Sequence, residues 1–285
     1  MKVTVVGAGA VGMLTACLLE QTGAETLLVT RRDEQAKTIN AQGIKKEDVV
    51  CKVKATANWN DIDPDSFILL AVKHSQLDEV MSLLETGFLS NPIVFLQNGM
   101  LHVEPAKNLP QEHIAVGSVE HGALKLSDCE VRHTGKGTIK FALLKGDENR
   151  FCPLLETEGF PCSWHGEADS LLFRKVLLNS LINPLTALMS IKNGELLTNP
   201  YAYELLKNLY KELGAAFPEM EVLLPFEEVA ALCASTAQNT SSMLADKKAG
   251  RRLELDTIVL YTLQRSPVEL PLLQGLYHLL KSAEV

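Results

Sequence analysis

The N-terminal stretch is the feature that most limits what this chain can fold into. A short run of mostly β-branched residues, Val3–Val6, leads straight into a glycine-rich turn, and an apolar helical pattern follows as far as Gly23. The turn has the spacing GxGxxG and consists of Gly7, Ala8, Gly9, Ala10, Val11 and Gly12. A strand, this turn and a helix in succession indicate a dinucleotide-binding βαβ unit. The sequence therefore predicts a Rossmann-type, doubly wound parallel sheet, with these six residues at its cofactor site.

Each glycine of the turn has its own physical role in such a unit. Gly7 permits the tight turn, Gly9 lets a pyrophosphate approach the backbone, and Gly12 lets the helix pack closely on the strand. The N-terminus of the helix then faces the phosphates with free N–H groups and the positive end of its dipole.

Two arginines after the second predicted strand favour NADP over NAD. The strand is Thr26–Thr30, and Arg31 and Arg32 follow it directly. NAD enzymes usually place an acid at this point for the ribose 2′-hydroxyl. A guanidinium instead binds a 2′-phosphate with two hydrogen bonds. Two alternatives stay open: Asp33 restores an acid if the alignment shifts by two residues, and the arginines could form a solvated surface.

Polar residues also follow the next two predicted strands. Phe67–Val72 and Pro92–Gln97 are apolar runs typical of buried parallel strands, and Lys73 and Asn98 come directly after them. Ligands bind at the carboxyl ends of strands in such sheets. We therefore expect Lys73 and Asn98 to contribute to the site. His121 follows a later strand, Ile114–Val119, but a lone histidine is more often structural, so it stays outside the catalytic set.

The second half of the chain is organised around one long apolar segment, 168–190. Its pattern predicts a buried helix. Three polar residues, Lys175, Asn179 and Asn183, interrupt the apolar pattern but not the helix. The spacing of four residues places these three polar groups on one face. Because an unpartnered buried polar group costs roughly 2–7 kcal/mol, they need partners, either in a structural hydrogen-bond seam or in a polar ligand.

The alternation of strands and helices stops near residue 165. The segments 201–217, 227–237, 255–263 and 272–281 all have helical periodicity, and prolines separate several of them. We therefore predict two domains: an α/β domain over 1–165 that binds the cofactor, and an all-helical domain over 166–285 that binds substrate and carries out catalysis.

Composition narrows the function classes. The net charge of −8 argues against a nucleic-acid or anionic-membrane surface, and no apolar run is long enough to cross a membrane. The six cysteines include no CxxC pair, so neither a metal site nor a disulfide framework is predicted, and a reducing cytoplasm fits best. The sequence does not fix the oligomeric state and leaves a homodimer open.

Taken together, these motifs resemble the ketopantoate reductase family of NADPH enzymes over nearly the whole chain. The most specific parts of the resemblance are the run Arg174-Lys175-x3-Asn179-x3-Asn183-Pro184-Leu185-Thr186-Ala187, then Asn193-Gly194-Glu195-Leu196, Ser241-Ser242-Met243 and Glu254-x-Asp256. The glycine turn and the run Gln97–Met100 agree as well.

The resemblance implies an oxidoreductase that uses NADP(H) to reduce ketopantoate, a small 2-oxo acid, in pantothenate biosynthesis. It makes Lys175 the general acid and Glu254 a catalytic, substrate-holding carboxylate. It implies that Asn179, Asn183, Asn193 and Ser242 bind substrate, that Lys73 and Asn98 lie beside the nicotinamide, and that Arg31 holds the 2′-phosphate.

Two alternatives remain. Leu253 stands where the family often has threonine, and Val259-Leu260 where an Asn-Gly pair is common. These departures affect the substrate side, so a sister NADPH-dependent reductase of another 2-oxo acid is the first alternative. The second is an NADP-binding sensor without turnover, which would have no use for a buried proton donor.

Overall fold

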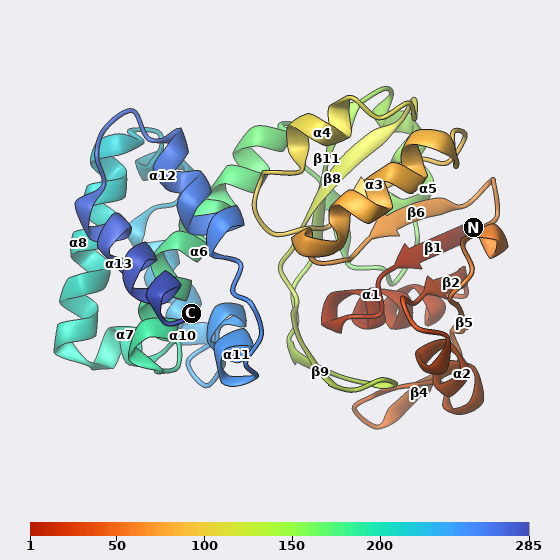
Figure 1. The fold of residues 1–285 in the computed structure, drawn as a ribbon, viewed down its shortest axis with the longest axis horizontal. Helices are drawn as coiled ribbons and strands as arrows, with labels where there is room; N and C mark the ends of the chain where they lie inside the picture. The colour runs from red at the N-terminus through yellow and green to blue at the C-terminus, as the bar shows by residue number, and fades with distance from the viewer. Residues whose placement is uncertain (285) are drawn as a thin grey trace. The chain divides into compact units, whose positions relative to one another are not determined.

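The computed structural model describes residues 1–284 and divides the chain into two compact units. Unit 1 contains Met1–Gln97 and His102–Leu171. Unit 2 contains the short segment Asn98–Leu101 together with the chain from Leu172 onward. Figure 1 shows the path of the chain through both units. The predicted fold class, an α/β N-terminal part with a helical C-terminal part, is confirmed.

An eight-stranded sheet forms the centre of unit 1 within the described chain. Its order is β12 (Cys162–Trp164), β11 (Ile139–Lys145), β8 (Ile114–Val119), β7 (Ile93–Phe95), β6 (Phe67–Leu70), β1 (Lys2–Val6), β2 (Glu25–Val29) and β5 (Lys54–Thr56). The strands from β5 to β8 are all parallel, and β11 joins antiparallel to β8. This is the 3-2-1-4-5-6 order of a dinucleotide-binding fold, in which the strand order, not the chain direction, reverses between β1 and β6.

Helices connect the parallel strands of unit 1. They are α1 (Ala10–Glu20), α2 (Asp33–Gln42), α3 (Leu77–Thr86), α4 (Val103–Lys107) and α5 (Cys152–Leu155), with short 3₁₀ turns at η1 (Trp59–Asp61), η2 (His74–Gln76) and η3 (Glu148–Phe151). The buried face of α3 carries Leu77, Val80, Met81 and Leu84, spaced as expected for a helix packed on one side only.

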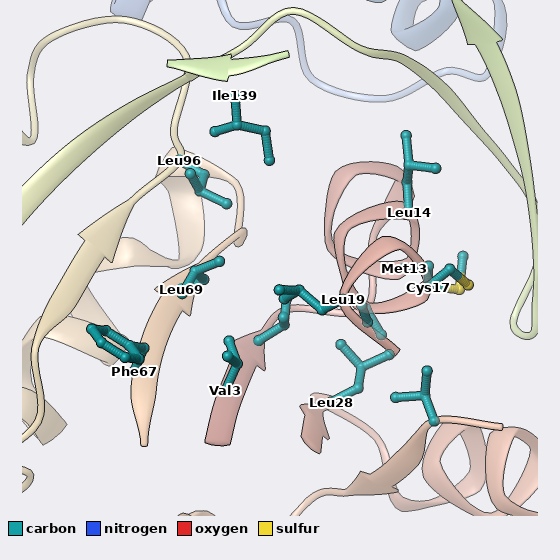
Figure 2. Close-up of a cluster of buried hydrophobic side chains, with 14 of the residues drawn as sticks. Val3, Met13, Leu14, Cys17, Leu19, Leu28, Phe67, Leu69, Leu96 and Ile139 are labelled. Atoms are coloured by element: carbon teal, nitrogen blue, oxygen red, sulfur yellow. The ribbon is translucent and has the colours of Figure 1, made fainter. Parts of the chain in front are cut away.

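A second, four-stranded sheet covers α1 from the other side. Its order is β4 (Val49–Cys51), β3 (Ile44–Lys46), β10 (Glu130–Gly135) and β9 (Gly122–Ser127), and α1 contacts both this sheet and β1–β2. Seven of the eleven residues of α1 are therefore buried, and Met13, Leu14, Cys17 and Leu19 join Val3 and Leu28 in the core (Figure 2). The sequence did not predict this sheet.

Within the described residues, every secondary-structure element of unit 2 is a helix or a helical turn. Its elements are α6 (Ala168–Met189, of which the first four residues belong to unit 1), α7 (Glu195–Thr198), α8 (Pro200–Ala216), α9 (Met220–Leu223), α10 (Phe226–Ser235), α11 (Ser242–Lys248), the π-helical turn η4 (Asp256–Leu260), α12 (Tyr261–Arg265) and α13 (Pro271–Ser282). Pro184 lies inside α6 without ending it. None of the described helices is long and apolar enough to cross a membrane.

One buried histidine makes the stability of unit 1 sensitive to acid. His102, which precedes α4, is 1% exposed and stacks on Phe95 at 5.6 Å between ring centroids. Within residues 1–284 neither of its ring nitrogens has a hydrogen-bond partner. Burial and the nearby charge of His74 lower the pKa of His102 to about 4. Protonating this ring in the folded state is therefore unfavourable.

We expect this histidine to reduce stability as the pH falls. Its pKa is about 4 when folded and about 6.5 when unfolded, so the unfolded chain binds more protons between these values. The contribution of His102 to the free energy of unfolding should fall by up to about 3 kcal/mol as the pH drops from 6.5 to 4, and stay flat above 6.5. His102→Phe should remove this component from urea-unfolding curves measured across that range, whereas His278→Gln, at an exposed position, should not. An unchanged pH dependence in His102→Phe would contradict this account.

Candidate active site

The glycine turn joins β1 to α1, and two of its glycines, Gly7 and Gly12, leave no room for a side chain. Gly7 has φ of +107°, and a Cβ there would lie 2.9 Å from the Ala71 carbonyl carbon. A Cβ on Gly12 would lie 1.8 Å from the Gly7 carbonyl oxygen. Both positions therefore exclude a side chain because of the protein's own packing.

Gly9 differs from its two neighbours in the motif. A Cβ at this position would meet no described atom within 4 Å, and its φ of −83° suits any residue. Nothing in the described structure requires a glycine here. Space kept open over the backbone at the start of a helix is what a bound pyrophosphate needs.

The N-terminus of α1 is suited to bind an anion. Gly9 is its N-cap residue and provides no side-chain hydrogen bond, and the first turn contains no acidic residue. The first N–H groups of a helix have no partner inside it, and the helix dipole adds positive charge at this end. Ala10, Val11 and Gly12 provide these N–H groups, as the sequence predicted for a phosphate site.

A pocket of about 410 Å³ opens beside the turn, entirely within unit 1. It brings together five of the nine residues predicted to bind the cofactor: Gly7, Ala8, Gly9, Arg31 and Lys73. Ala10, Val11 and Gly12 lie directly after them at the start of α1, and Asn98 belongs to unit 2. The pocket lies at the carboxyl ends of β1, β2 and β6. Its basic side chains are Arg31 and Arg32 after β2, Lys73 after β6, and Lys125 in β9. Three features of this pocket suit a phosphorylated dinucleotide: the uncovered backbone at Gly9, the N-terminus of α1 and the basic residues of the lining.

In unit 2, the three polar residues predicted on one face of α6 become more buried toward its C-terminal end. Lys175 and Asn179 are half-buried, and Asn183 is 4% exposed. Among the described residues, the buried Nδ2 of Asn183 has no hydrogen-bond partner. An unpartnered buried amide costs free energy, and a polar ligand would satisfy it.

Asn193 shows the same feature nearby in the sequence. Its Nδ2 donates to Thr236 Oγ1 at 3.0 Å, while its buried Oδ1 has no partner in the described chain. Ser242 is the exposed first residue of α11. The neighbouring Ser241 has a structural role instead, since its Oγ caps α11 by accepting from the Leu244 N–H at 3.2 Å.

Glu254 pairs with Asn98 inside unit 2. The Asn98 Nδ2 donates to Glu254 Oε2 at 3.2 Å. Gly99 follows with φ of +82°, and a Cβ there would lie 2.3 Å from the Thr257 carbonyl oxygen. The segment Asn98–Leu101 therefore packs against the π-helical turn η4 that begins just after Glu254. Such turns are frequent at functional sites, and no sequence pattern predicted this one.

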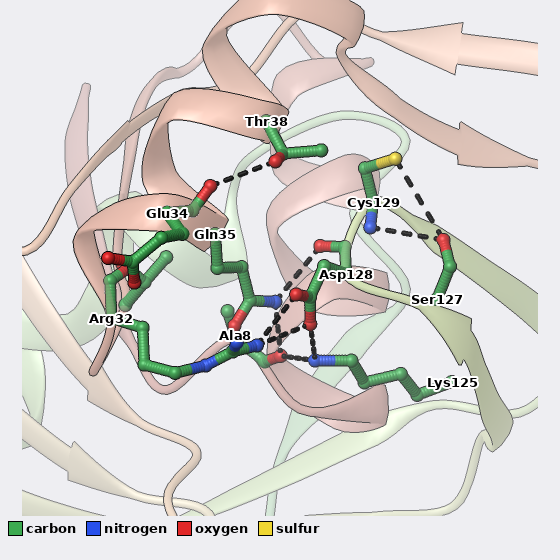
Figure 3. Close-up of polar contacts among 10 residues, drawn as sticks. Ala8, Arg32, Glu34, Gln35, Thr38, Lys125, Ser127, Asp128 and Cys129 are labelled. Atoms are coloured by element: carbon green, nitrogen blue, oxygen red, sulfur yellow. Dashed lines mark hydrogen bonds and ion pairs between the residues drawn. The ribbon is translucent and has the colours of Figure 1, made fainter.

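Three further polar residues near the pocket were missed by sequence reasoning. Gln35, Lys125 and Asp128 form a hydrogen-bonded cluster with Arg32 and the glycine turn (Figure 3). Lys125 and Asp128 come from the β9–β10 hairpin, far from the motif in sequence. No local pattern marks them.

The remaining polar candidates do not form a second site. His121 Nδ1 lies 3.0 Å from His133 Nε2 and accepts from the Gly137 N–H at 3.1 Å. Burial and the neighbouring His133 lower the pKa of His121 to about 4, consistent with a structural role. All six cysteines, which lie within the described residues, are free thiols. Over residues 1–284, no group of three or more His, Cys, Asp or Glu side chains is placed to hold a metal ion.

Comparisons with known proteins cover both halves of the chain. The family model described as "Ketopantoate reductase PanE/ApbA" matches residues 3–146, and that described as its "C terminal" part matches 168–284. A 2-dehydropantoate 2-reductase of Bacillus subtilis is 37% identical over 275 residues, covering 94% of this chain and 92% of the relative. One of Listeria monocytogenes is 33% identical, covering 100% and 97%. The crystal structure of the Bacillus subtilis panE protein superposes with a TM-score of 0.84 at 35% identity, covering 99% of both chains.

Proposed function

This chain belongs to the ketopantoate reductase PanE/ApbA family, and on that premise we propose that it reduces ketopantoate to pantoate with NADPH. It is then an NADP-dependent oxidoreductase acting on a CH–OH group, and its product serves pantothenate biosynthesis in the cytoplasm. The observation that carries this proposal is the match to relatives named 2-dehydropantoate 2-reductase over nearly the full length of both partners. All of the residues assigned below belong to one chain, and a homodimer stays a prediction from the sequence.

The pocket of unit 1 supports NADPH as the cofactor. Its open backbone at Gly9 and the N-terminus of α1 suit the pyrophosphate, and Arg31 on the rim suits the 2′-phosphate. We assign Lys73 and Asn98 to the nicotinamide side of the cofactor. NADPH, when bound, supplies the hydride that reduces the ketone carbon.

The residues of unit 2 supply the rest of the chemistry. The ketone oxygen gains charge as the carbon is reduced, and we assign Lys175 to give it a proton. Asn179, Asn183, Asn193 and Ser242 hydrogen-bond the substrate and orient it, and the unpartnered Nδ2 of Asn183 and Oδ1 of Asn193 support this role. Glu254, already an acceptor for Asn98, accepts a hydrogen bond from the substrate hydroxyl; like charges make it unsuited to the substrate carboxylate.

The test is a turnover assay with a panel of 2-oxo acids. Purified protein is mixed with NADPH or NADH, and oxidation is followed by the loss of reduced-cofactor absorbance. We expect ketopantoate to give the highest kcat/KM and NADPH to be preferred. Faster turnover of another 2-oxo acid would make the chain a sister reductase. Cofactor binding without oxidation by any member of the panel would make it a sensor.

A further inference from the structure

The β9–β10 hairpin brings two charged side chains to the glycine turn. Lys125 Nζ donates to the Ala8 carbonyl oxygen at 3.1 Å, and Gln35 Nε2 donates to the same oxygen at 3.1 Å (Figure 3). Gln35 also donates to the Asp128 carbonyl oxygen at 2.9 Å. The tip of the hairpin is therefore attached to the motif that is predicted to hold the pyrophosphate.

Asp128 holds two cations at once. Arg32 Nη2 donates to its two carboxylate oxygens at 2.7 and 2.6 Å, and Lys125 Nζ lies 3.1 Å from Oδ1. The Arg32 guanidinium, aided by Lys125, lowers the pKa of the Asp128 carboxyl. Asp128 is therefore an anion that neutralises part of the positive charge of Arg32 and Lys125.

Both cations also line the cofactor pocket, and Asp128 does not. The charged side chains of the lining are basic at Arg31, Arg32, Lys73 and Lys125 and acidic at Glu79 alone. The acid that begins α2, Asp33, pairs with Lys37 at 2.6 Å and does not line the pocket. The lining of the pocket thus carries more positive than negative charge. Three of its four basic residues come from the end of β2 and from the β9–β10 hairpin.

Arg32 keeps further donors for a ligand. Its side chain is 53% exposed, and the contacts to Asp128 use Nη2 alone. Within residues 1–284 its Nε and Nη1 make no hydrogen bond, and its side chain does not cap α2. A guanidinium in this state can bind a phosphate without first unfolding any local structure.

We propose that Arg32 and Lys125 bind the cofactor 2′-phosphate together with Arg31, and that Asp128 is the built-in anion that the phosphate displaces. This inference rests on the proposed use of NADPH, and it adds a hairpin distant in sequence to the residues that set cofactor choice. A phosphate monoester carries a charge of about −1.5 to −2 and three acceptor oxygens, so it offers both cations more than one carboxylate does. NAD lacks this group and would leave the Asp128 pairs in place.

Binding measurements on four variants test the proposal. Arg32→Gln and Lys125→Gln should each raise the Kd of NADP⁺ by about 10-fold or more, the usual loss for one hydrogen bond to a charged group, and change the Kd of NAD⁺ less than about twofold. Asp128→Asn removes the competing charge and should lower the Kd of NADP⁺ several-fold without changing that of NAD⁺. Arg132→Gln, an exposed arginine of β10 outside the pocket lining, is the matched control and should change neither.

Isothermal titration calorimetry with NADP⁺ and NAD⁺ gives these values without any turnover. Thermal melting of each variant checks that it is folded. Equal effects on both cofactors, no effect, or weaker NADP⁺ binding by Asp128→Asn would overturn the proposal. This outcome does not depend on the identity of the substrate. A chain that reduces another 2-oxo acid would still show the predicted loss of NADP⁺ binding. A chain that reduces ketopantoate could lack that loss, which would overturn this proposal and leave the proposed function standing.

Discussion

Replacing Lys175 by alanine should lower kcat with ketopantoate and NADPH by about 10²–10⁴-fold, the usual contribution of a positioned general acid. The Kd of NADPH should stay within about twofold, because Lys175 is assigned to the substrate ketone and does not line the pocket assigned to the cofactor. Steady-state kinetics and direct cofactor titration measure the two quantities separately.

The matched control for this variant is Lys211→Ala, at an exposed lysine of α8, which should leave kcat unchanged. A second readout separates proton donation from a loss of packing. Added ammonium or a small primary amine should restore part of the activity of Lys175→Ala, with a pH profile that follows the added amine. An unchanged kcat in Lys175→Ala would remove the lysine from the mechanism.

Gly9→Ala should abolish tight NADPH binding while leaving the fold intact. A methyl group at this position meets no described protein atom within 4 Å, and the backbone there suits alanine, so the free energy of unfolding should be nearly unchanged. The same methyl group would occupy the space assigned to the pyrophosphate. We expect the Kd of NADPH to rise by roughly 100-fold, corresponding to the loss of one or two hydrogen bonds to a charged group.

Gly12→Ala is the contrasting variant in the same motif. Its methyl group would lie 1.8 Å from the Gly7 carbonyl oxygen, so the turn and α1 must shift apart. We expect this variant to unfold at lower urea concentration than the parent, with a loss of at least about 1–3 kcal/mol. Chemical unfolding and cofactor titration of the two variants form one experiment. If Gly9→Ala bound NADPH as well as the parent does, the pyrophosphate would not lie over this glycine.

The sequence predicted the central architecture because its signals are local. The strand, glycine turn and helix at the N-terminus are contiguous, and the apolar runs that became β6 and β7 mark further parallel strands. The loss of alternation after Trp164 predicted the helical second half. Each of these patterns can be recognised within one helix or strand and its immediate neighbours in sequence.

The four-stranded sheet was missed because its strands carry no such pattern. β3 and its turn include Lys45, Lys46 and Glu47. β9 has no buried residue, and β10 has one, Val131, so none of these strands shows a run of buried apolar residues in sequence. One signal was present but indirect. The helix after the glycine turn is apolar on nearly all sides, which indicates cover on more than one side.

The same distinction applies to the candidate site. The glycine motif and the pair Arg31–Arg32 could be located by their position after strands. Lys125 and Asp128 could not, because only the pairing of β9 with β10 and the packing of this hairpin beside α1 bring them to the turn. The contact of Asn98 with Glu254 was likewise beyond the sequence, since 156 positions separate the two residues.

The two units are not separable by one cut in the polypeptide. The chain leaves unit 1 after Gln97, returns at His102 and leaves again after Leu171. A truncated gene ending at Leu171 would keep Asn98 and Gly99 but delete Glu254 and Thr257, against which they rest. A chimera that combines unit 1 of one family member with unit 2 of another therefore needs three junctions. Residues 98–101 must come from the same parent as the C-terminal half.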